Sequence, residues 1–256
     1  MVSGVLSTIA AFAALAGGTG PDKVAQRYKL DVVINQNIDA TAAGQGVLNS
    51  EITGAAWLTL SLSDTTGGQL AHLVIDSFTV NATGQAAMQF SPDLASALKG
   101  QYLHGYIVDG KLSGSAKPSV EDNPTMNLVM PAMNALFPGV GARAATAQSW
   151  SDTTRNNTIN EGGSQNTESI VDWTVNSREG AMLNLTGAAR GTVTIESPEQ
   201  QVSGTVTSTS TVTSVVGGPS TSATLNSKQV LTVLISALPD PLPVNIETRA
   251  TLTSLP

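Results

Sequence analysis

Apolar and polar residues alternate along most of the chain after residue 24, which is the pattern of β-strands with one face in the core and one in water. The alternation is clearest in residues 57–63 and 206–213, and in the second stretch threonine fills every second position. Threonine suits a pleated surface and keeps a hydroxyl for water. We predict strands at residues 26–34, 54–63, 70–80, 86–90, 102–108, 169–176, 180–189, 191–197, 201–215, 220–236 and 242–255.

Two short helices are predicted to interrupt these strands. Ser91-Pro92-Asp93 combines a capping residue, a proline at the first helical position and an acid that the helix dipole favours. Leu94 and Leu98 then lie on one face of that helix. The second helix is predicted at residues 131–137, because Pro138-Gly139 ends it.

Composition divides the chain into four segments. Residues 1–21 are an apolar signal-like or anchoring segment, and residues 111–150 are a connector rich in proline and methionine that contains a short helix. Residues 22–110 and 151–256 are an N-terminal and a C-terminal β half of similar style. Their strands are longer than the usual five or six residues. We therefore predict an all-β fold whose long, twisted antiparallel strands form a curved sheet or half-open barrel.

The first 21 residues carry no charged side chain. Ala14-Leu15-Ala16 before Gly17 has the small-x-small form of a signal-peptidase site, although the positively charged region of a signal peptide is missing. The apolar run is shorter than the roughly 20 residues of a membrane span. We expect an export signal, and attachment to a membrane or a buried N-terminal helix are the alternatives.

Charge and composition exclude several classes of function. The chain has 12 Lys and Arg against 19 Asp and Glu, a net charge of −7, which argues against a protein that follows nucleic-acid phosphates. It has no cysteine, so disulfides, thiol catalysis and iron–sulfur clusters are excluded. His72 and His104 are the only imidazoles. Together with Asp76 or Asp109 they could hold a metal ion, but we expect ordinary strand histidines.

Catalytic motifs are sparse. Ser96-Ala97-Leu98-Lys99 matches the S-x-x-K motif of penicillin-recognising enzymes, but the companion S-D-N and K-T-G motifs are absent and the match lies in a predicted helix. The chain has no G-x-S-x-G elbow, P-loop or G-x-G-x-x-G. We therefore predict a protein that is not an enzyme, with no catalytic residues, no cofactor and no metal site.

Three short segments resemble a group of exported, uncharacterised, β-rich bacterial proteins. They are Leu136-Phe137-Pro138, the stretch Gln148-Ser149-Trp150-Ser151-Asp152-Thr153, and the last predicted strand. That group usually has Gly-Asp-Ser-Trp in the middle segment, whereas this chain has Ala147-Gln148 in place of Gly-Asp. The resemblance implies a β protein outside the cytoplasm. The chain also resembles, more weakly, the membrane-extrinsic subunits of photosynthetic reaction-centre and light-harvesting complexes.

Two functions fit these observations. The first is a periplasmic or extracytoplasmic structural protein, peripheral to a membrane, that stabilises a membrane protein complex and contacts that complex or the membrane surface through its N-terminal segment. The second is a carrier that holds a lipid or another apolar ligand in a curved half-barrel, with the connector as a lid. The methionines of the connector and Phe137 could form part of a lid or docking surface. Filling the core is the simpler role for them, because methionine fills irregular gaps. The candidate contact residues for a partner or ligand are Met126, Met130, Met133, Phe137, Phe12 and Leu15.

Overall fold

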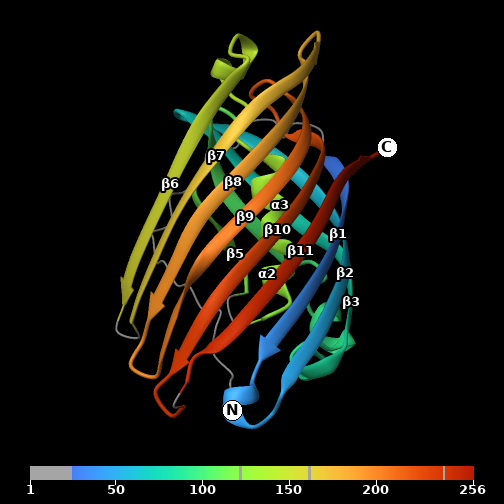
Figure 1. Cartoon of the computed structure of the whole chain (residues 1–256). Helices are drawn as coiled ribbons and strands as arrows, with labels where there is room; N and C mark the ends of the chain where they lie inside the picture. Colours follow the sequence, from blue (N-terminus) through green and yellow to red (C-terminus); the bar gives the residue numbers. More distant parts are fainter. Residues whose placement is uncertain (1–24, 121–122, 161–162, 239) are drawn as a thin grey trace.

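The computed structural model describes residues 25–120, 123–160, 163–238 and 240–256, and most of these residues lie in strands (Figure 1). The helical segments are short. They are η1 (Thr41–Ala43), η2 (Gly84–Met88), α1 (Pro92–Ser96), α2 (Met126–Val129), α3 (Pro131–Leu136) and η3 (Ala142–Ala145). The strands are β1 (Gln26–Asp39), β2 (Val47–Thr65), β3 (Gly68–Ala82), β4 (Tyr102–Val108), β5 (Lys111–Pro118), β6 (Ser149–Asn160), β7 (Gly163–Glu179), β8 (Met182–Glu196), β9 (Gln200–Val215), β10 (Ser220–Ile235) and β11 (Leu242–Leu255).

All described strands belong to one antiparallel sheet with the order β5-β4-β3-β2-β1-β11-β10-β9-β8-β7-β6. Strands that follow each other in sequence are neighbours, except β5 and β6, and β1 pairs with β11, which is distant in sequence. This pairing places Leu30 opposite Leu252 and joins the two β halves edge to edge. Because β5 and β6 stay at opposite edges, the sheet is curved but open, as the sequence predicted.

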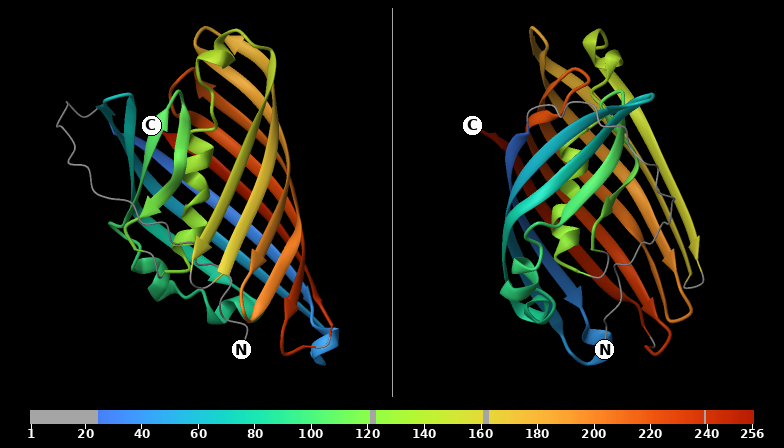
Figure 2. Two further views of the ribbon diagram at one scale, coloured as in Figure 1. Left: turned by 90° about the vertical axis from the view of Figure 1, so that its left-hand side faces the viewer. Right: turned by 180° about the vertical axis from the view of Figure 1, so that it is seen from behind.

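The two faces of the sheet differ in chemistry. On β9, Val202 and Val212 point inward and are buried, whereas Thr205, Thr207 and Thr209 point outward and are exposed. The helices α2 and α3 lie inside the curve of the sheet (Figure 2), so the buried positions mark the concave face. Alternation along each strand therefore gives an apolar concave face and a hydroxyl-rich convex face.

The Ser91 helix cap acts as predicted, and the residues of one hairpin turn explain its geometry. Asp109 and Gly110 both have positive φ, 48° and 71°, which a two-residue hairpin with the favoured twist requires, and they join β4 to β5. Helix α1 begins at Pro92, and the backbone N–H of Leu94 donates to the Ser91 side-chain oxygen at 3.3 Å. Helix α3 lies over residues 131–136, one residue shorter than predicted.

Several predicted boundaries are wrong. Residues 86–88 belong to the 3₁₀ helix η2 and residues 89–90 follow it, so no strand forms there. A run of five mostly apolar residues has no distinct period, and Gly84, with φ 64°, turns the chain. The two strands predicted at 180–189 and 191–197 are one strand, β8. Gly191 does not break it: a Cβ there would clash with the Glu168 carbonyl oxygen, so this glycine permits a close approach of β7.

The predicted connector contains more regular structure than expected. Strand β5 occupies its first residues and β6 begins inside its last residues. The short helix α2, which was not predicted, precedes α3. Both strands are rich in polar residues and lie at the sheet edges, which weakens the alternation that reveals a strand.

The seam between β1 and β11 gives the first test of the fold. Leu252 is 1% exposed on the concave face, and the next residue toward the N-terminus, Thr251, is exposed on the convex face. We expect Leu252→Ala to lower the free energy of unfolding by about 2 to 5 kcal/mol. Thr251→Ala is the matched control and should change it by less than about 0.5 kcal/mol. Urea unfolding measures both, and equal losses would contradict this register.

Candidate functional site

The concave face carries two separate apolar clusters. The larger cluster is sealed, because helices α2 and α3 pack against the sheet and contribute Met133 and Leu136, each 0% exposed. Its sheet members include Leu185, Val212 and Leu252. The chain that follows α3 is tied to two hairpin turns, since Gly139 N–H donates to the Gly110 carbonyl at 3.0 Å and Gly217 N–H donates to the Val140 carbonyl at 2.7 Å. This end of the half-barrel is therefore closed.

The second cluster, which we call the far cluster, lies on the same concave face, away from the helices. All of its members come from strands or from the turn after β10. Four of them are buried and six are only partly buried. The buried members are Val202, Val233, Leu242 and Val244, and the partly buried members are Ile38, Ile195, Leu231, Ile235, Leu238 and Ile246.

Small side chains separate the two clusters. The inward positions between them on β8 and β9 include Gly187, Ala189, Ser208 and Ser210, and Ser227 continues the band on β10. All of these except Gly187 are partly exposed. The buried ring of Trp173 covers Gly187, where a Cβ would lie only 2.8 Å from that ring. These small side chains lie along the concave face between one apolar cluster and the other.

The sealed cluster contains buried hydroxyl groups without a hydrogen-bond partner among the described residues. They belong to Tyr28 and Thr125, both 0% exposed. Burial raises the pKa of the Tyr28 hydroxyl far above its usual value. Ser220 has a third such hydroxyl. Because an unpaired buried polar group is costly, these positions are where a water molecule or a polar ligand group would bind.

The structure places most of the predicted contact residues in the core. Met126, Met133 and Phe137 are at most 3% exposed, and Met130 is partly buried against the same cluster. They pack between the helices and the sheet, and only Met130 is partly exposed. The remaining predicted contacts, Phe12 and Leu15, lie outside the described residues.

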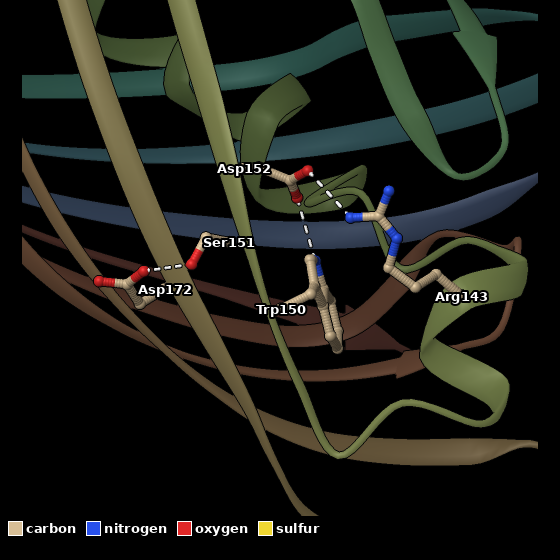
Figure 3. Close-up of polar contacts among 5 residues, drawn as sticks. All are labelled: Arg143, Trp150, Ser151, Asp152 and Asp172. Atoms are coloured by element: carbon tan, nitrogen blue, oxygen red, sulfur yellow. Dashed lines mark hydrogen bonds and ion pairs between the residues drawn. The ribbon is translucent and has the colours of Figure 1, made fainter.

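A polar network occupies the sheet edge at β6 (Figure 3). The Trp150 indole N–H donates to the Asp152 carboxylate at 3.0 Å, and Arg143 from η3 lies 3.8 Å from the same carboxylate. The Trp150 ring stacks on Trp173, with centroids 6.3 Å apart. Sequence reasoning did not find this network, although the two-residue spacing of Trp150 and Asp152 places both on one face of a strand.

A second network lies on the convex face of the same strands. Ser151 donates to Asp172 at 2.5 Å, and Arg190 lies 2.8 Å from the other oxygen of that carboxylate. The hydrogen bond from Ser151, followed by that from Arg190, lowers the pKa of Asp172. These contacts join β6, β7 and β8 and favour the ionised form of the carboxylate. The network therefore has a structural role.

The other candidate positions show no catalytic arrangement among the described residues. The Ser96 hydroxyl donates to the Pro92 carbonyl of its own helix at 2.8 Å, so the S-x-x-K match is part of a helix surface. No group of three or more His, Asp or Glu side chains in the described ranges could hold a metal ion. A shallow depression of about 400 Å³ on the convex face is lined by polar residues, including Thr207, Lys228 and Glu247.

The comparisons with known proteins give no family. No protein-family model matches the chain, and no curated protein sequence does. Among solved structures, lipovitellin, in a structure that concerns its lipid–protein interactions, has 13% identity and a TM-score of 0.45, and covers 91% of this chain. The chain spans 25% of the lipovitellin chain.

Two further similarities are more distant. An outer membrane channel from Pseudomonas putida F1 has 8% identity and a TM-score of 0.24 over 91% of this chain and 96% of the channel. A mutant Rh. blastica porin has 8% identity and a TM-score of 0.21, covering 91% of this chain and 100% of the porin. All three TM-scores are below 0.5. Among the described helices, none is long and apolar enough to cross a membrane.

The network around Asp172 on the convex face predicts how the stability of the fold depends on pH. Because its pKa is lower in the folded chain, Asp172 stabilises the fold above its unfolded pKa, and this contribution is lost as the pH falls through the folded value. We expect Ser151→Ala to raise the Asp172 pKa toward its ordinary value in a carboxyl NMR titration. Thr153→Ala, which lies on the same face of β6, is the control and should leave that pKa unchanged.

Proposed function

We propose that the protein is a non-catalytic carrier that holds a lipid or another ligand with an apolar chain along the concave face of its half-barrel. The main support for this proposal is the far cluster. It presents half-buried isoleucine and leucine side chains on a concave surface to which the helices do not contribute. An extended acyl chain would cover these side chains.

The shape of the concave face supports a ligand that enters from the far cluster. The sealed end is filled by α2 and α3 and tied by backbone hydrogen bonds, so a ligand would not enter there. Next to the sealed end, the band around Ala189, Ser208 and Ser227 carries small, partly exposed side chains that a ligand chain would cover. Each methylene group that moves from water onto an apolar surface gains about 0.8 kcal/mol, so a long acyl chain would supply most of the binding free energy. The polar head of such a ligand would stay at the open end.

We further propose that the protein acts outside the cytoplasm. The charge-free first 21 residues, with their small-x-small site, support export. The hydroxyl-rich convex face, with its exposed threonines on β9, suits an aqueous compartment such as the periplasm. A carrier in that compartment would move apolar molecules that water does not dissolve.

The carrier function is tested with a fluorescent fatty acid and two adjacent substitutions on β10. Leu231 points into the far cluster, whereas Val230 points outward and is 47% exposed. We expect the wild-type chain to bind the probe and Leu231→Asp to weaken binding by at least roughly tenfold, because a charge in an apolar site costs several kcal/mol. Val230→Asp should bind like the wild type. Equal affinities of all three proteins, or no binding by the wild type, would contradict the carrier function.

A second function, a structural subunit that binds a protein partner, is favoured by the free edge at β6. This strand is twelve residues long, pairs with β7 without a register shift and has one neighbour in the described sheet. The opposite edge strand, β5, is shorter, contains a register shift and ends in proline. Only β6 therefore offers a long, regular row of hydrogen-bonding groups to an added strand.

Proline substitutions test this second function. The Gln148 carbonyl accepts from Val175 N–H, so Trp150, Asp152 and Thr154 bond toward β7, and the intervening residues point their backbone groups to the free edge. Thr153→Pro should therefore leave the fold intact and remove a subunit that co-purifies stoichiometrically with the wild type. Thr154→Pro should instead destabilise the fold, because it removes a ladder hydrogen bond. Unchanged co-purification with Thr153→Pro would exclude β6 as the docking edge.

A further inference from the structure

The only two histidines of the chain face each other across two neighbouring strands. His72 on β3 pairs directly with His104 on β4. Their sequence neighbours Leu73 and Leu103 are buried on the concave face, so both imidazoles lie on the convex face. They are 32 residues apart in sequence, and the antiparallel register alone brings them together.

The hydrogen-bond pattern shows that this is the closer of the two kinds of antiparallel pair. Ile75 N–H donates to the Gln101 carbonyl at 2.8 Å, which marks a hydrogen-bonded position in the same register. Hydrogen-bonded and non-hydrogen-bonded positions alternate along the ladder, so His72 and His104, three positions on, form a non-hydrogen-bonded pair. In such pairs the Cβ atoms are about 4.5 to 5.5 Å apart, and the side chains lie close together.

The surroundings favour the neutral form of both imidazoles. Burial lowers the pKa of His72, and burial, followed by the charge of Lys117 and then that of His72, lowers the pKa of His104. The Tyr102 ring packs beside them, with its centroid 4.5 Å from that of His72 and 6.0 Å from that of His104. Neutral imidazoles keep a lone pair available at neutral pH, which a metal ion requires.

We propose that His72 and His104 together chelate one divalent transition-metal ion on the convex face, with Cu²⁺ the tightest binder. A metal–nitrogen bond of about 2.0 to 2.1 Å needs the two donor nitrogens roughly 3 Å apart, which a non-hydrogen-bonded cross-strand pair allows. The neighbours in register are Ser61 on β2 and Lys117 on β5, neither of which has a carboxylate. Two imidazoles without carboxylates favour Cu²⁺ over Mg²⁺ or Ca²⁺, and water molecules complete the coordination.

The test is a titration of the full chain with Cu²⁺ at neutral pH, followed by electron paramagnetic resonance. The expected result is one ion per chain, coupled to two imidazole nitrogens. The chain contains no other histidine and no cysteine, so this signal has one possible source. A spectrum with one imidazole nitrogen or none would overturn the proposal without any substitution.

Substitutions then separate a chelate from two independent sites. His72→Gln and His104→Gln should each weaken binding by roughly a hundredfold, because the second imidazole acts at high effective concentration. The double variant should also lose the remaining imidazole and show no specific Cu²⁺ binding. Independent sites would instead give two ions per chain, and each single variant would bind one ion with unchanged affinity. Lys117→Gln should tighten binding, because it removes a positive charge beside His104. Circular dichroism checks that each variant is folded.

Discussion

The antiparallel pairing of β1 with β11 is the interaction on which the rest of the structure depends. It joins the first described strand to the last and turns two meanders into one sheet. The far cluster crosses this seam, since Ile38 of β1 lies opposite Val244 of β11. Without the seam, each half would expose another free edge, and the concave face would be split between them.

Curvature then gives the two faces different roles. The concave face is sealed at one end by α2 and α3, and at the other end its apolar side chains belong to strands and one turn. The convex face carries exposed threonines on β9 and the ionised pair of Asp172 and Arg190. The same alternation that forms the strands therefore gives one sheet an apolar concave face and a polar, solvent-exposed convex face.

The edge strand β6 combines protection against unspecific strand addition with a regular row of backbone groups. Asp152 places a charge on the inward side of β6, where Trp150 and Arg143 contact it, and inward charges of this kind discourage unspecific strand addition. The long regular edge nevertheless remains available to a partner whose strand suits it. A carrier that delivers its ligand to a membrane complex would use both features, the concave face for the ligand and β6 for the complex.

Much of the fold could be predicted from sequence, because alternation, Asp109-Gly110 and the Ser91 cap are local signals. The polar edge strand β6 was missed, since an edge has little need of apolar residues. The break expected at Gly191 was wrong, because its cause is the neighbouring backbone of β7. The site was harder to predict. The far cluster and the pairing of His72 with His104 depend on register between distant strands, which local patterns do not specify.

The most direct test of the carrier account is to locate the bound ligand. A spin-labelled fatty acid would be added to the protein, and paramagnetic broadening of methyl signals would be measured by NMR. A ligand on the concave face should strongly broaden Ile195, Leu231 and Ile246, and should have little effect on Val230 or Thr209 on the convex face. Broadening centred on the convex face, or spread evenly over both faces, would contradict it.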